Sequence, residues 1–71
     1  MSTTNNNDIF IQYTIDGSGE VKKLSVKAED IYKDGVIDRS KVLSLAASNE
    51  ASNGNAVINP IVLDSNFQPI N

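Results

Sequence analysis

The chain has 71 residues, a net charge of -3 and no His, Cys or Trp. Without imidazole or thiol it lacks the commonest general base, the usual zinc ligands and the strongest nucleophile, so we predict no enzyme and no cofactor. Six Lys and Arg are interleaved with nine Asp and Glu, which argues against the dense basic surface of a nucleic-acid groove. The longest apolar runs fall far below the roughly 20 residues of a membrane-spanning helix. We therefore expect no nucleic-acid partner and no membrane.

A chain of this length forms one domain with a thin core. It buries only about 60% of the surface that the unfolded chain exposes, and such a core leaves roughly 3 to 5 kcal/mol of net stability. Disulfides and Cys/His metal sites are impossible, so the supports that remain are an oxygen-ligated cation or association with other chains. The polar start of the sequence has neither the basic residues nor the apolar stretch of a secretory signal, so we expect the cytoplasm or a particle assembled there.

The first part of the chain predicts a polar arm followed by a β-hairpin. Residues 1–8 are polar and rich in Asn, and we interpret them as a flexible amino-terminal arm. In residues 9–15 every second residue is Ile or Tyr, which is the period of a half-buried strand. Residues 16–19 contain two glycines that accept positive φ, and residues 20–28 alternate again. Because an isolated hairpin is marginal in water, a later segment must cover its apolar face.

The covering segment is predicted to be a helix over residues 39–50. Its apolar and small residues fall at helical spacing. The expected stripe contains Val42, Leu45, Ala46 and Asn49, widened by Leu43 and Ala47. Asp38 can cap the amino end, and the Asn53-Gly54 pair marks the end. A strand over residues 42–45 is the competing interpretation, but the Ala pair and the Glu that follow favour the helix.

A third strand and a tail complete the predicted domain. Residues 56–63 are rich in Val and Ile, and Pro60, which lacks an N–H, places this strand at a sheet edge or a bulge. Residues 64–71 are predicted to form a turn followed by an extended tail. Phe67 and Ile70 are costly to leave in water, so we expect the tail to dock on this domain or on a neighbour.

Together these elements predict a small, single α+β domain over residues 9–63. Its order is ββαβ: an amino-terminal β-hairpin, one helix and a carboxyl-terminal edge strand. The sequence leaves the order of strands in the sheet open. Lys22, Lys23 and Lys27 form a positive patch on the hairpin, where lysines commonly protect an exposed sheet edge.

The densest acidic stretch, residues 29–38, is a candidate calcium loop. Starting at Asp30, it resembles a degenerate EF-hand or dockerin loop, with Asp30, Asp34 and Asp38 as candidate calcium ligands. Two positions depart from that pattern, because Tyr32 lacks a ligand oxygen and Lys41 stands where the bidentate Glu belongs. We therefore expect no metal here.

A surface loop is the favoured interpretation of the same stretch. In that case Asp34 and Gly35 form its turn, while Asp38 caps the next helix. The apolar residues expected to tuck inward are Ile31, Val36 and Ile37.

The absence of His and Cys favours a function in binding or structure. Tyr13 is expected in the core, and the candidate partner-binding residues are Tyr32, Phe67 and Ile70. The leading hypothesis is a non-enzymatic structural or accessory subunit that acts through a protein partner or through self-association in a larger assembly. The first alternative is a free-standing acidic binding module or inhibitor, such as a viral accessory protein. A weak calcium-binding protein is the second alternative.

Overall fold

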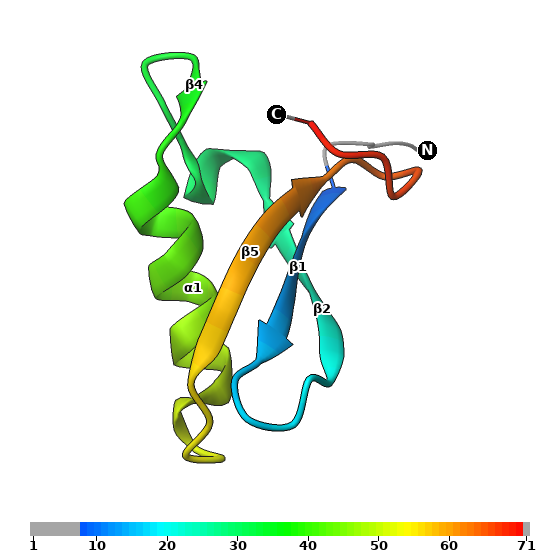
Figure 1. The fold of residues 1–71 in the computed structure, drawn as a ribbon. Helices are drawn as coiled ribbons and strands as arrows, with labels where there is room; N and C mark the ends of the chain where they lie inside the picture. The colour runs from blue at the N-terminus through cyan, green and yellow to red at the C-terminus, as the bar shows by residue number, and fades with distance from the viewer. Residues whose placement is uncertain (1–7, 71) are drawn as a thin grey trace.

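The computed structural model describes residues 8–70 and shows a three-stranded sheet with one helix packed on it (Figure 1). The α+β class and the ββαβ order expected from the sequence are confirmed. A further small hairpin, β3–β4, comes between β2 and the helix in chain order. The elements are β1 (Asp8–Ile15), β2 (Val21–Lys27), the 3-10 turn η2 (Ala28–Asp30), β3 (Tyr32–Lys33), β4 (Val36–Ile37), α1 (Arg39–Ala51) and β5 (Val57–Leu63). Of the expected amino-terminal arm, all but Asp8 lies outside the described residues.

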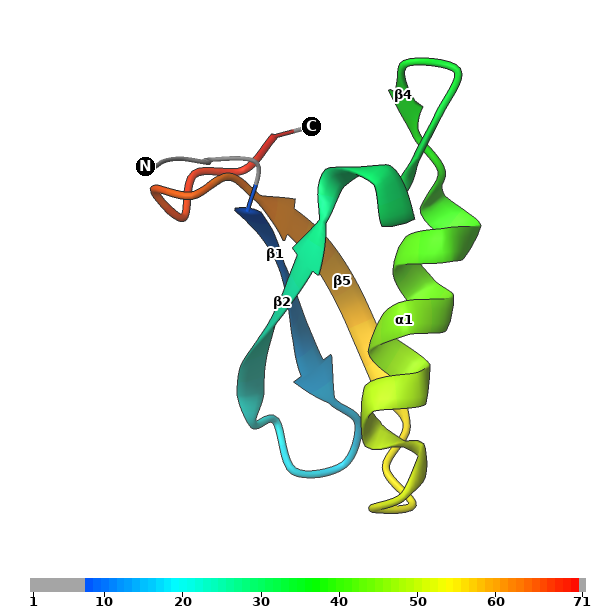
Figure 2. The same cartoon turned by 180° about the vertical axis from the view of Figure 1, so that it is seen from behind.

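Strand β1 is the centre of the sheet. The order is β2-β1-β5, and both pairings are antiparallel. Because side chains alternate between the two faces of a strand, the Ile and Tyr residues of β1 all point to one side. Helix α1 covers that side, as the two opposite views show (Figures 1 and 2). The buried core contains Ile9, Ile11, Tyr13, Ile15, Val26, Ile31, Val42, Ala46 and Val62.

Helix α1 begins at the predicted cap. The carboxylate of Asp38 accepts hydrogen bonds from the N–H groups of Ser40 (3.0 Å) and Lys41 (3.4 Å), and from the Ser40 hydroxyl (2.7 Å). The hydroxyl bond from Ser40, helped by the two N–H groups, lowers the pKa of Asp38. The helix ends at Ala51, before Gly54 with φ 72°, as the Asn-Gly pair predicted.

The buried face of α1 is narrower than the sequence indicated. Val42, Ala46 and Glu50, spaced four residues apart, are its buried residues. Leu43 is 47% exposed, and Ala47 and Asn49 are also exposed, so the assignment of these three to the buried stripe was wrong. The reason for Leu43 and Ala47 is geometric, since each lies about 100° around the helix from the buried residue before it.

Removing the cap should destabilise the helix in a measurable way. We expect Asp38→Ala to lower the thermal midpoint Tm by several degrees, because two amino-terminal N–H groups lose their acceptor. The matched variant Asp38→Asn keeps an acceptor oxygen and should stay much closer to the parent. Thermal unfolding followed by circular dichroism compares the two, and equal losses in both would contradict a capping role.

Strand β5 lies at the sheet edge, as Pro60 predicted. The register with β1 shifts between Gln12 and Thr14, which pair with Ile61 and Ile58, so two residues of β5 face one residue of β1. Asn59 within this bulge has φ 54°. Strand β5 therefore combines both positions that a proline tolerates, an edge and a bulge.

The carboxyl-terminal tail folds back beside β5. Asp64 N–H donates to the Gln68 carbonyl (2.8 Å), and Ile70 N–H donates to the Val62 carbonyl (2.9 Å). Pro69 forms an isolated antiparallel bridge with Leu63. The tail thus covers the last part of the β5 edge.

The β3–β4 hairpin turns at Asp34 and Gly35, which have φ 55° and 84°. Ile31 before it is fully buried, and Ile37 is half-buried. Val36 is 65% exposed, so the expectation that it tucks inward was wrong. In this hairpin Ile37 pairs with Tyr32 toward the core, and Val36, being the next residue on the strand, faces the other way.

Candidate functional site

The most unusual chemical group in the described chain is a buried carboxylate on α1. Glu50 is only 1% exposed, and its oxygens accept hydrogen bonds from the Tyr13 hydroxyl (2.6 Å) and the side-chain amides of Asn55 (3.0 Å) and Asn53 (3.2 Å). The Lys22 ammonium lies 3.4 Å from one of these oxygens. Glu50 therefore joins β1, β2 and the segment after α1 to the end of the helix.

This environment separates the pKa values of Glu50 and Tyr13. The Tyr13 hydrogen bond, followed by those from Asn55 and Asn53, lowers the pKa of Glu50 from 4.5 to about 2 against the opposing effect of burial. Burial, followed by the hydrogen bond to Glu50, raises the pKa of Tyr13. Near neutral pH the pair therefore consists of a carboxylate and a protonated phenol.

The geometry assigns Glu50 a structural role. A general base needs an acceptor within reach of a substrate proton and a pKa near the working pH. Both Glu50 oxygens already accept from the protein, and the Tyr13 oxygen accepts from the Asn49 amide (2.8 Å). The pair thus has neither free acceptor geometry nor a pKa suited to proton transfer. Tyr13 lies in the core as expected, whereas sequence reasoning did not single out Glu50.

The candidate calcium ligands lie at three separate structural positions. Asp30 ends the 3-10 turn η2, Asp34 lies at the tip of the β3–β4 hairpin, and Asp38 caps α1. Between residues 8 and 70, no three acidic side chains come together in a group that could hold a metal ion. Strand β2 also occupies the place where an EF-hand has its first helix.

The candidate partner-binding residues do not form one surface. Phe67 lies on Phe10, with ring centroids 4.9 Å apart, and the Lys23 ammonium is 5.4 Å from the Phe67 centroid. Ile70 lies at the β5 edge, whereas Tyr32 packs against the core. Phe67 remains 52% exposed, so of the three it presents the largest accessible aromatic area.

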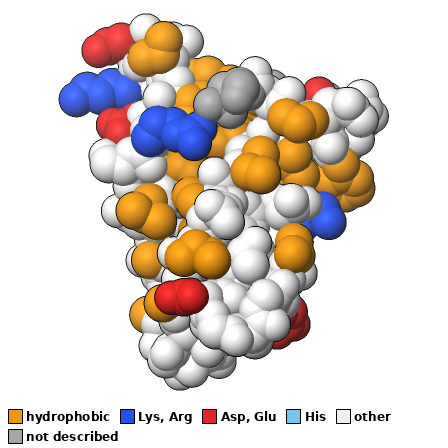
Figure 3. Space-filling view, viewed as in Figure 1, with side chains coloured by type: hydrophobic (Ala, Val, Ile, Leu, Met, Phe, Trp, Pro, Cys, Tyr) orange, Lys and Arg blue, Asp and Glu red, His pale blue; other side chains and the backbone are white. Residues whose placement is uncertain are grey.

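The sheet face opposite α1 carries apolar side chains that no helix in the described part of the chain covers. We call Phe10, Ile58, Ile61 and Phe67 the outer face. The register pairs Ile61 with Gln12 and Ile58 with Thr14, so both isoleucines lie on the side of the sheet away from the core. Ile61 is 38% exposed. In Figure 3, apolar side chains are exposed around the tail and along β5.

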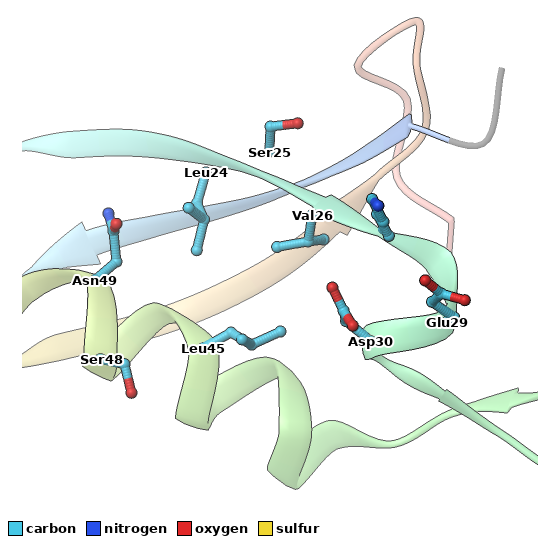
Figure 4. Close-up of a pocket in the computed structure, with 9 residues that line it drawn as sticks. Leu24, Ser25, Val26, Glu29, Asp30, Leu45, Ser48 and Asn49 are labelled. Carbon is cyan, nitrogen blue, oxygen red and sulfur yellow. The ribbon is translucent and has the colours of Figure 1, made fainter. Parts of the chain in front are cut away.

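A groove of about 700 Å³ runs between β2 and α1. Figure 4 shows Leu24 and Val26 pointing from β2 toward the helix, where Leu45 points back at them, and Ser25 pointing to the opposite side. The full lining is Leu24, Ser25, Val26, Lys27, Glu29, Asp30, Leu45, Ser48 and Asn49. A neighbouring hollow of about 370 Å³ shares Glu29, Asp30 and Leu45 and extends toward the start of α1. The sequence could not reveal this groove because its two walls come from separate segments.

No family model, curated protein or solved structure matches this chain. Among the helices of the described part, none has both the length and the apolar character needed to cross a membrane.

Proposed function

We propose that this protein is a non-enzymatic structural or accessory subunit that acts through protein contacts, and that its outer face is a self-association surface. The observation that supports this proposal is the exposure of Phe67, Ile58 and Ile61 on a sheet face that no helix within residues 8–70 covers. The solvent side of an antiparallel sheet is commonly polar. Large apolar side chains on such a face are typical of an interaction site.

Burial of the outer face against a second copy would lower the free energy of the chain. The core of a 71-residue chain leaves little net stability, and apolar area gains roughly 25 cal/mol per Å² when it leaves water. Two copies can meet face to face, because sheets stack at about 10 Å with their inner side chains interdigitated. Phe10 and Phe67 would then lie inside the contact, and Lys23 at its rim.

Light scattering on a size-exclusion column, at several concentrations of the full chain, tests this proposal. We expect an oligomer that dissociates on dilution, and we expect the double variant Ile61→Ser with Phe67→Ser to shift it to monomer. The matched control is Leu43→Ser, which removes a comparably exposed side chain from α1. Circular dichroism confirms that the variants are folded.

Two results would contradict the proposal. One is a folded monomer at every concentration, which would favour the free-standing binding module instead. The other is an oligomer that loses as much stability with Leu43→Ser as with the outer-face variant.

A further inference from the structure

Within residues 8–70, the outer edge of β2 presents backbone groups that no other strand pairs with. Ile15 N–H donates to the Glu20 carbonyl (2.8 Å), and hydrogen-bonded pairs alternate along an antiparallel ladder. The N–H and C=O groups of Val21, Lys23, Ser25 and Lys27 therefore point away from β1. Strand β2 is the outermost strand on its side of the sheet in the described structure. This edge can accept one more strand.

The groove lies where the side chains of an added strand would go. Residues of a new strand opposite Leu24 and Val26 would point to the helix side, into the space between β2 and Leu45 (Figure 4). The apolar side chains that line this space are Leu24, Val26 and Leu45, and the polar Ser48 and Asn49 lie beside them on α1. Backbone pairing at an edge combined with pockets for alternate side chains is the general mode of β-strand addition.

The charges at this edge favour one kind of occupant. Lys23 and Lys27 lie on the opposite side of β2 from Leu24 and Val26. On that side of the sheet they would be next to the guest side chains that point away from α1. A second copy would bring its own lysine-bearing β2 against these lysines, which repel it. A guest with acidic residues at these positions is complementary.

The far end of the groove sets the direction of the guest. Glu29 and Asp30 line the groove just after the end of β2. A strand antiparallel to β2 begins at this end, so its amino terminus would lie beside the two carboxylates. We infer that the β2 edge and the β2–α1 groove together bind an extended, antiparallel peptide segment of a partner protein, with apolar side chains alternating with acidic ones and its amino terminus at Glu29 and Asp30.

This site is distinct from the outer face proposed for self-association. The guest would lie beside β2 and under α1, whereas the outer face is on the other side of the sheet around β5 and the tail. Lys23 belongs to both, because its ammonium also lies 5.4 Å from the Phe67 ring centroid. Ser48→Trp, which changes only the groove, and Ile61→Ser with Phe67→Ser, which changes only the outer face, therefore test the two sites separately.

The direct test is titration calorimetry of the full chain with a synthetic peptide of 7 residues, the length of β2. In this probe Val alternates with Asp, the amino terminus is free and the carboxyl terminus is amidated. We expect saturable binding that weakens with added salt, and loss of binding when the Asp nitrogens are methylated. Methylation removes the N–H groups that face β2, keeps every charge and adds only one methyl group per Asp. Acetylation of the amino terminus should lower the affinity severalfold.

Protein variants check the same contacts from the other side. Lys23→Glu with Lys27→Glu should lower the affinity at least about tenfold, whereas Lys33→Glu, with the same kind of charge change on β3, should lower it by less than about twofold. Ser25→Pro removes an N–H that faces solvent and not β1, so the sheet keeps its ladder while the guest loses a bond. Ser48→Trp fills the groove and gives a second route if the proline variant is unfolded.

The outcomes separate clearly. Strand addition is supported if the unmodified peptide binds the parent protein, the Asp-methylated peptide does not bind, and the Ser48→Trp variant binds neither peptide. Equal binding of the methylated peptide would overturn the inference, because it would show attraction to lysines alone. Absence of binding by the unmodified peptide at low salt would also overturn it.

Discussion

Replacing Ile11 with Ala should leave the chain largely unfolded in dilute solution. Ile11 is fully buried at the centre of the core, between β2, β5 and α1. Truncation of such a side chain costs about 2 to 5 kcal/mol, which is as large as the roughly 3 to 5 kcal/mol of net stability expected for this size. Urea unfolding followed by circular dichroism at low protein concentration measures the loss.

Ile61→Ala is the matched control for this prediction. It makes the same chemical change in the neighbouring strand, but Ile61 is on the outer face. Because part of its side chain is already in water, its truncation should cost about 1 kcal/mol or less in the monomer. If the two variants lost equal stability, the helix side of the sheet would not be the main core.

The second large effect is expected in acid. The folded pKa of Glu50 is about 2, below its ordinary value of 4.5. Above pH 4.5 the carboxylate is ionised in both states, and its contribution to stability is complete. As the pH falls from there toward about 2, the unfolded chain takes up the proton first, so this contribution is progressively lost. The lowered pKa of Asp38 acts in the same direction.

At alkaline pH the contribution of Tyr13 to stability is lost as the pH rises, whereas that of Glu50 is lost as the pH falls. The pKa of Tyr13 is raised above its ordinary value of 10.0, so the fold favours the protonated phenol. Its contribution is complete below pH 10.0 and is lost as the pH rises through the folded pKa. We therefore expect a stability plateau between these limits, measured as Tm against pH.

Glu50→Gln tests the source of the acid limb. The variant should be less stable than the parent at neutral pH and should show a shallower loss of Tm between pH 4.5 and about 2. The matched control is Glu29→Gln, which removes an exposed carboxylate on η2 and should leave the loss of Tm in acid unchanged. An acid limb equally steep in Glu50→Gln would assign it to other carboxylates.

Local patterns predicted the backbone elements well. The period-two alternation of β1 and the glycine-containing turn after it indicated the hairpin, and the Asp38 cap located the helix start. Pro60 identified an edge strand because a missing N–H is a local fact. Each of these features depends on residues close together in sequence, so each is readable without the fold.

Long-range contacts explain what the sequence did not reveal. Glu50 interacts with Tyr13, 37 residues away, and with Lys22 on the other strand of the hairpin. A Glu near the end of a short helix ordinarily indicates a solvent-exposed position. The one local signal was its spacing, eight residues after Val42 on the line through Ala46. The same argument applies to the β2–α1 groove, which exists only once the helix lies on the sheet.

The unequal edges of the sheet also bear on aggregation. Growth of a continuous intermolecular sheet uses both edges of every copy, so it needs the β5 edge as well as the β2 edge. At the β5 edge, Pro60 has no N–H to offer, the bulge at Asn59 breaks the register, and the Val62 carbonyl already accepts from Ile70. One open edge and one closed edge permit capture of a single strand but not propagation, so the fold resists the end-to-end polymerisation that leads to fibrils.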